Sequence, residues 1–302
     1  MRVYILPCLA AVMIAADPSV LPSKEIKIGR AVVNVEFTPG HTDLAPEAVM
    51  KWVSNAVDAV TLYYGQFPVR HAQLKIRIED GRNGVFNGMT WGRQDGALTR
   101  ISLGAQTDQR HLDRDWMLTH ELIHYGFPSV PDENHWIEEG IATYVEPIAR
   151  VQAGQLTAET IWSDMVQQMS QGQPESGDQG LDNTHTWART YWGGALFCMV
   201  ADVEIREKTH NRKGLQDAFR AILKAGGSID DDWPLKRAFK VGDAATGVNV
   251  LTQLYEQMKD KPVQVDLPAL WKRLGIKREG RGVVFDDEAP LAAVRRAITS
   301  AR

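Results

Sequence analysis

The chain has 302 residues, of which 44% are hydrophobic and 24% are charged, a composition that predicts a sizeable buried core in one or two lobes. Its formal net charge is −4, and Lys and Arg are dispersed along the chain, which excludes the basic patch of a nucleic-acid interface. We therefore expect no nucleic-acid partner.

Residues 1–16 differ in character from the rest of the chain. Arg2 is followed by a short apolar run that ends in small residues, a pattern typical of a secretory signal peptide. The run is too short to span a bilayer, and its alternative is a buried N-terminal strand. We expect an exported protein, periplasmic or secreted, with no transmembrane segment in the mature chain. The oligomeric state does not follow from the sequence.

Residues 17–110 are predicted to form a small, β-rich N-terminal lobe. Alternation of apolar and polar residues indicates strands, and the Asp-Gly pair at 95–96 indicates a hairpin turn. The expected elements are strand-like spacing over 25–38, an amphipathic helix over 44–65, a strand over 71–79, and a hairpin of 84–92 and 97–104.

Residues 120–124 spell His-Glu-Leu-Ile-His, an HExxH string. On an α-helix, residues four apart lie one turn apart on the same face, so the two imidazoles can bind one Zn²⁺ ion while Glu121 transfers a proton. The alternative is a surface helix that carries these residues by chance. The apolar residues from Trp116 to Ile123 argue against a solvated helix, and buried polar side chains need a partner such as a metal.

A catalytic zinc usually has three protein ligands and one open position. Fourteen residues separate His124 from Glu139, and the glycine and prolines among them allow a second helix to turn back toward the first. Glu139 is therefore a possible third ligand beside His120 and His124. An acidic helix start at Glu138 and Glu139, favoured by the helix dipole, is an equal alternative from these residues alone. His135 is a rival ligand.

The pattern from residue 111 onward is helical, which predicts a catalytic lobe over residues 111–260 and a C-terminal appendage, residues 261–302, packed on it. The polar, glycine-rich stretch 172–182 predicts a mobile loop beside the cleft. The expected helices are 112–126, 137–152, 157–171, 187–208, 214–226, 246–260, 267–275 and 290–299, and a strand is expected at 283–285.

Two stretches resemble the gluzincin zinc metallopeptidases, and most closely their M1 and M61 aminopeptidase groups. The run from Trp136 to Glu146 is similar to their second helix, whose glutamate ligand precedes a glycine, and the run from Tyr191 to Ala195 is similar to their Tyr-x-x-Gly-Ala segment. The resemblance covers residues 112–225. It implies an α+β fold, with a small mixed sheet lobe, a mainly helical lobe and a zinc site in the cleft, as in thermolysin-like catalytic domains.

The resemblance also implies residue roles. Glu139 would complete the ligand set of one Zn²⁺ ion, and the Tyr191 hydroxyl would stabilise the tetrahedral intermediate. Without the resemblance, a packing role for Tyr191 would be favoured. Two features depart from the M1 pattern: eighteen residues intervene before the glutamate ligand in M1 enzymes, against fourteen here, and Gly193 replaces a lysine.

In gluzincins an edge strand pairs with the substrate backbone, and residues 85–91 are the candidate here, although an ordinary hairpin strand is an equal alternative. Its substrate-binding residues would be Asn87, Gly88 and Met89. M1 enzymes carry an acidic residue in a Gly-x-Met-x-Asn strand that anchors the substrate amine, and this chain has no equivalent. Aminopeptidase and endopeptidase activity are therefore both open.

Thr143 and Glu146, one and two turns beyond Glu139, are candidates to orient the imidazoles by accepting their free N–H groups. Either side chain could instead pack or face water. The function expected from all these features is a zinc-dependent peptidase that acts on peptides or proteins. The alternatives are a non-catalytic binding or scaffold protein with a structural or vestigial metal site, which would not need Glu121, and another zinc-assisted hydrolysis such as amide cleavage in cell-wall material.

Overall fold

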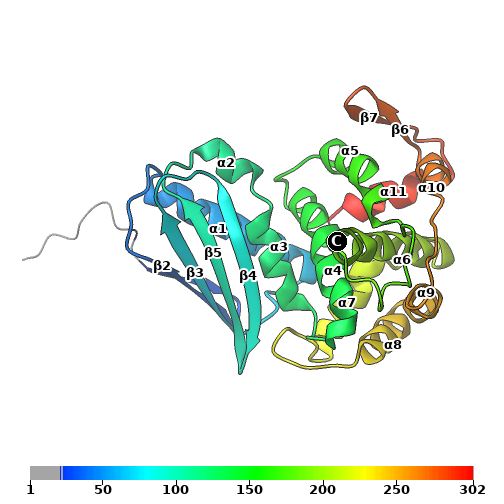
Figure 1. The fold of residues 1–302 in the computed structure, drawn as a ribbon, viewed down its shortest axis with the longest axis horizontal. Helices are drawn as coiled ribbons and strands as arrows, with labels where there is room; N and C mark the ends of the chain where they lie inside the picture. Colours follow the sequence, from blue (N-terminus) through cyan, green and yellow to red (C-terminus); the bar gives the residue numbers. More distant parts are fainter. Residues whose placement is uncertain (1–20, 22, 302) are drawn as a thin grey trace, which may run out of the picture.

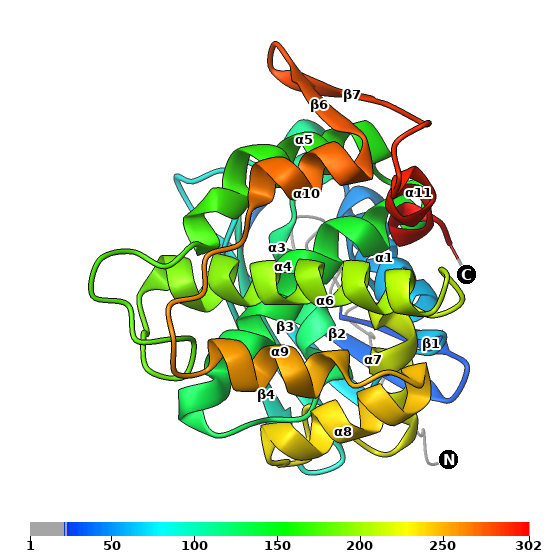
Figure 2. The same ribbon diagram turned by 90° about the vertical axis from the view of Figure 1, so that its right-hand side faces the viewer.

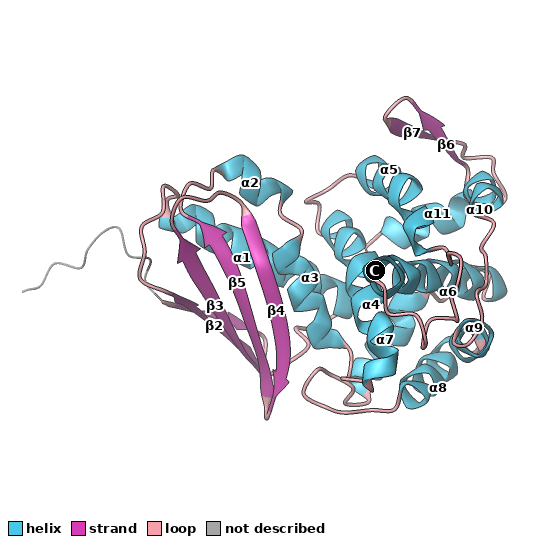
Figure 3. Ribbon diagram, viewed as in Figure 1, coloured by secondary structure: helices cyan, strands magenta, loops and turns pink. Residues whose placement is uncertain are grey.

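The computed structural model describes residue 21 and residues 23–301. The predicted signal peptide, residues 1–16, lies outside the described residues. The fold is α+β, with a five-stranded mixed sheet on one side and a group of helices on the other (Figures 1 and 3). In the described part of the chain, no helix is both long and apolar enough to cross a membrane.

The sheet has the strand order β1-β2-β3-β5-β4. Parallel neighbours are β2 with β3 and β3 with β5, whereas β1 pairs antiparallel with β2, and β4 pairs antiparallel with β5 at the edge nearest the helices (Figure 1). The long helix α1 makes the crossover that the parallel pair β2 and β3 requires. The bounds are β1 Lys24–Ile28, β2 Ala31–Phe37, α1 Pro46–Tyr64, β3 His71–Glu79, β4 Val85–Arg93 and β5 Gly96–Gly104.

The strand-like segment 25–38 is two strands, because the chain turns at Gly29 with a φ of 57° that glycine adopts without strain. The expected helix over 112–126 is likewise divided, into α2 (Gln109–Arg114) and α3 (Met117–Ile123). Asp115 causes the division, since its carboxylate accepts hydrogen bonds from the backbone N–H of Met117 and Leu118 at 3.0 and 3.2 Å. The HExxH helix therefore starts at a capped end.

The helical part surrounds two long helices, α4 and α6 (Figure 2). Its elements are α4 His135–Gln152, α5 Ala158–Gln168, α6 Gly194–Lys208, α7 Leu215–Lys224, α8 Leu235–Thr246, α9 Val250–Met258, α10 Leu267–Leu274, β6 Ile276–Glu279, β7 Gly282–Phe285 and α11 Ala292–Thr299. The sequence did not predict α8, which contains Gly242, or β6, which pairs with the expected strand β7. Gly242 fits because a Cβ there would lie 2.7 Å from Leu251.

The stretch 172–182, predicted to be a mobile loop, is anchored at both of its aspartates. The Asp182 carboxylate accepts hydrogen bonds from Trp136 Nε1 at 2.8 Å and from the Tyr255 hydroxyl at 2.7 Å. Asp178 forms a buried ion pair with Arg189 at 2.7 Å. The polar residues that suggested a solvated loop are instead the groups that attach it to α4, α9 and the segment before α6.

Helices α4 and α6 cross at a pair of glycines. A Cβ placed on Gly140 would lie 2.3 Å from the Cα of Gly194, and a Cβ on Gly194 would lie 2.1 Å from the carbonyl oxygen of Trp136. These distances are far below van der Waals contact, so the two backbones touch where both side chains are absent. Glu139 and Tyr191 stand close to this crossing in sequence, which makes the crossing important for both.

We expect Gly140→Ala to lower the free energy of unfolding by about 1–3 kcal/mol, because the added methyl group must push α4 and α6 apart. Urea denaturation followed by circular dichroism measures this change. Ala244→Ser, on an exposed face of α8, is the control and should change stability by less than about 0.5 kcal/mol. Equal stabilities of Gly140→Ala and the wild type would contradict the close crossing.

Candidate metal centre

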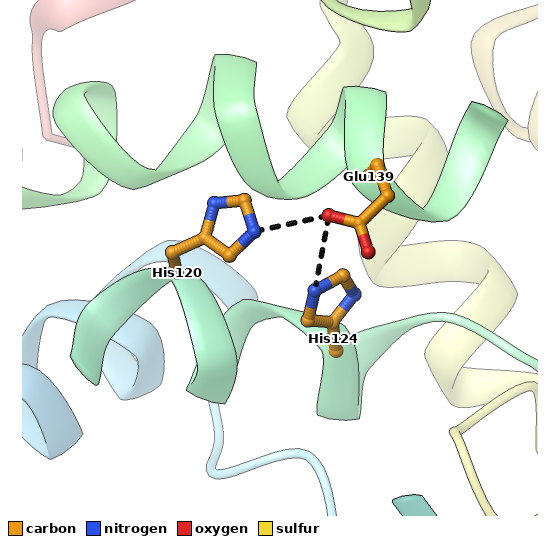
Figure 4. A group of neighbouring side chains, drawn as sticks. All are labelled: His120, His124 and Glu139. Carbon is orange, nitrogen blue, oxygen red and sulfur yellow. Dashed lines mark hydrogen bonds and ion pairs between the residues drawn. The ribbon is translucent and has the colours of Figure 1, made fainter. Parts of the chain in front are cut away.

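Three side chains from two helices converge on one point (Figure 4). His120 lies on α3, His124 begins the 3-10 turn that follows it, and Glu139 comes from α4. Glu139 Oε2 is 3.2 Å from His120 Nε2 and 3.7 Å from His124 Nε2. One ligand atom from each residue lies within 4.8 Å of the other two, so the group can hold a metal ion.

The donor set and its charge state fit a divalent cation. Two imidazole nitrogens and one carboxylate oxygen are donors typical of a three-ligand zinc site. Burial raises the pKa of Glu139, but the neighbouring His124 and the hydrogen bonds to His120 and His135 outweigh it, and the net pKa lies well below the usual range. Glu139 is therefore ionised at neutral pH, as a ligand must be.

Glu121 points from α3 toward strand β4. Its carboxylate Oε2 accepts a hydrogen bond of 2.6 Å from the Thr90 hydroxyl. Burial raises the pKa of this carboxyl, although His124 and Thr90 act in the opposite direction. A carboxylate whose pKa is raised is a stronger base, which suits proton transfer near neutral pH. Thr90 was not singled out in the sequence, because its approach depends on how β4 lies against α3.

Strand β4 bulges where it passes Glu121. The register with β5 shifts between Phe86 and Met89, and Asn87 has a φ of 54°. A Cβ on Gly88 would lie 2.5 Å from Glu121 Oε1, so a side chain at this position would push the Glu121 carboxylate aside. Of the three residues predicted to contact substrate, Gly88 and Met89 line the cavity described next and Asn87 does not.

A cavity of about 640 Å³ lies between β4 and the metal-ligating residues. Its walls include Glu121, His124, Glu139 and Tyr191 on the helical side, and residues 88–94 of β4 and its turn on the other. Because β4 is the edge of the sheet, one side of its backbone has no neighbouring strand within the sheet. The arrangement can accommodate an extended chain that runs along β4 past the metal centre.

Tyr191 stands on a π-helical turn, Arg189–Gly193, directly before α6. Its ring stacks on that of His120, with centroids 6.1 Å apart. Burial raises the pKa of Tyr191 to about 12, with the Glu139 and Glu121 carboxylates contributing. The hydroxyl therefore stays protonated and can donate a hydrogen bond at neutral pH. Arg189 Nη1 donates to the Gly172 carbonyl at 2.6 Å, which holds the turn in place.

The two residues proposed to orient the imidazoles have other surroundings. Glu146 accepts a hydrogen bond of 3.0 Å from Arg150 Nη1 in a buried ion pair, and Thr143 makes no hydrogen bond to either imidazole among the described residues. His135, proposed as a rival ligand, instead approaches Glu139 Oε1 at 3.4 Å and bonds Glu138 Oε2 at 2.8 Å. The spacing of His135 from the two glutamates, one helical turn, was the available signal for this contact.

Solved structures with a similar fold include M1 zinc metallopeptidases. An aminopeptidase N family protein from Idiomarina loihiensis matches with a TM-score of 0.64 at 10% identity, covering 84% of this chain and 49% of that chain. A mutant M1 zinc metallopeptidase from Deinococcus radiodurans, bound to a Tyr-Ser-Ala substrate, matches with a TM-score of 0.51 at 13% identity, covering 82% and 53%. The chain spans about half the length of these structures.

No family model matches the sequence, and no curated protein does so. At identities of 10% and 13%, the structural likeness shows the fold alone. The chain has the fold of the gluzincin metallopeptidases of the M1 type, and the resemblance predicted from the sequence is confirmed at that level.

We expect the purified protein to bind about one Zn²⁺ ion per chain. His124→Ala should weaken zinc binding by more than about 100-fold. Loss of a residue that only hydrogen-bonds a ligand weakens metal affinity by about 10–100-fold, and loss of the ligand itself should weaken it further. Metal analysis after dialysis, with competition against a chelator, measures both. His41→Ala removes an exposed histidine and should leave the zinc content unchanged, and wild-type protein without zinc affinity would exclude the site.

Proposed function

We propose that the protein is a zinc-dependent peptidase that hydrolyses peptide bonds in the cavity between β4 and the helices. The observation that supports this most directly is the placement of Glu121. A metal site alone needs only His120, His124 and Glu139, yet a second buried carboxylic residue, Glu121, stands beside the metal-ligating residues in the same cavity. That group has a role in hydrolysis and none in simple metal retention.

In the proposed reaction, His120, His124 and Glu139 hold the zinc ion. When bound, zinc supplies a Lewis acid that lowers the pKa of water toward neutrality. Glu121 accepts a proton from the attacking water and passes it to the leaving amine, and the Thr90 hydrogen bond fixes the orientation of its carboxylate. Tyr191 donates its hydroxyl proton in a hydrogen bond to the oxygen of the carbonyl under attack.

The substrate is proposed to be a peptide that adds as a strand to the free edge of β4. Backbone pairing at an edge gives affinity for many sequences. The Deinococcus radiodurans protein of similar fold was solved with a tripeptide bound. The predicted signal peptide supports export to the periplasm or medium, where this activity would act. In this proposal the sheet and the helices are separate lobes, and the cleft between them binds the peptide.

Glu121→Gln should retain zinc and lower peptide turnover by about 10³-fold or more, because the amide cannot accept the proton. The measurement is cleavage of a peptide library with free and with blocked N-termini, analysed by mass spectrometry. Glu133→Gln, an exposed change, should cleave like the wild type. Comparing the two libraries distinguishes aminopeptidase from endopeptidase activity. A zinc-loaded wild type that cuts neither library would favour the binding-protein alternative.

Tyr191→Phe should lower kcat by about 10²–10³-fold and leave KM within a few-fold, since it removes a hydrogen bond made to charge that develops only in the transition state. Steady-state kinetics on the best library peptide measures both constants. Tyr255→Phe is the matched control on α9, where the hydroxyl contacts Asp182. Equal loss of kcat in both variants would mean that Tyr191 acts through packing.

A further inference from the structure

A second cavity, of about 600 Å³, lies on the other side of the metal-ligating residues. His120 and Tyr191 form part of its wall, and Tyr191 also lines the first cavity, so the two cavities are neighbours with Tyr191 between them. Its remaining apolar wall comes from three separate segments of the chain: Trp116 before α3, residues on α4 and α5, and the segment before α6. The apolar lining residues are Trp116, Pro147, Leu156, Ile161, Trp187 and Trp192.

The aromatic side chains of this cavity form a continuous row with the metal-ligating residue His120. Trp116 meets the His120 ring edge-on at 5.3 Å, and Trp187 stacks on Tyr191 at 5.5 Å. Both tryptophans leave much of their surface in solvent, with Trp116 50% and Trp187 62% exposed. Two exposed tryptophans beside a metal centre are costly to hydrate, and such apolar surface is typical of a binding site.

The charged residues of the cavity give little reason to expect a charged occupant. Glu146 and Arg150 form a buried ion pair, and Arg150 Nη2 also donates to the Asp113 carbonyl at 3.0 Å. Asp113, Arg114 and Asp164 are exposed at the rim, where water solvates them. The inner surface is therefore mainly aromatic and aliphatic.

We propose that this cavity is the subsite for an aromatic or large aliphatic side chain directly adjacent to the scissile bond of the substrate. The inference rests on the proposed peptidase function. A peptide that runs along β4 in the first cavity reaches His120 and Tyr191 at its reactive carbonyl, and the next side chain beyond them enters the second cavity. Trp116 and Trp187 are then specificity-determining residues, which contribute indole surface to the wall that the side chain contacts.

The first test is the cleavage-site profile of the wild type, Trp116→Ala and Trp187→Ala on the peptide library. The wild type should prefer Phe, Tyr, Trp or Leu over Ala or Asp by about tenfold or more at one position flanking the cut, because such side chains bury large apolar area. Each alanine variant should reduce that preference to a few-fold while retaining zinc, and Trp187→Phe should restore most of it.

The second test does not require turnover. Calorimetry on the zinc-loaded protein compares phenylalanine hydroxamate with alanine hydroxamate, and we expect about tenfold tighter binding of the former, lost in Trp187→Ala. Cleavage without any preference at either flanking position, together with equal binding of the two hydroxamates, would overturn the subsite and leave the peptidase function intact. Preferential hydroxamate binding by a protein that cuts no peptide would support the subsite and refute the peptidase function.

Discussion

The close crossing of α4 and α6 is the constraint on which the site depends. Gly140 and Gly194 allow the two backbones to touch, and Glu139 and Tyr191 stand within three residues of these glycines in the sequence. Glu139 precedes Gly140, and Tyr191 lies on the turn that leads into α6. The contact that packs the helices therefore also sets how far the carboxylate and the phenol stand from the histidines of α3. A substitution at this crossing is therefore expected to affect both the stability of the fold and the geometry of the site.

The two buried glutamates of the site show how surroundings separate the roles of identical groups. The pKa of Glu139 is lowered because imidazoles surround it, whereas the pKa of Glu121 is raised because burial outweighs its fewer favourable partners. One carboxyl is thereby held as a permanent anion suited to a cation, and the other is adjusted toward exchanging a proton. Burial acts on both carboxyls in the same direction, and the number of imidazole partners decides the net shift of each pKa.

The edge strand contributes to this enclosure through an irregularity. At the bulge, Asn87 takes a left-handed φ and Gly88 passes within contact distance of Glu121. A regular strand with a side chain at this position would displace the carboxylate. The bulge therefore brings the backbone of β4 next to the Glu121 carboxylate.

The sequence by itself determined the parts of this protein that follow from local periodicity. The helical spacing of His120 and His124 and the alternation in residues 71–79 both depend on neighbours along the chain, and the structure has α3 and β3 at these places. The sequence did not predict the helix that contains Gly242 or the division into two strands at Gly29. A glycine can end a helix or strand or allow a close contact inside one, and the sequence alone does not distinguish these two roles.

Only the tertiary structure decided which distant residues meet. Thr90 on Glu121, Tyr191 on His120, and Asp182 on Trp136 and Tyr255 all join segments far apart in the sequence, whose approach no local pattern encodes. The physical reason is that side-chain chemistry fixes what a group can bind, whereas the packing of helices and strands fixes which groups come within a few ångströms of it.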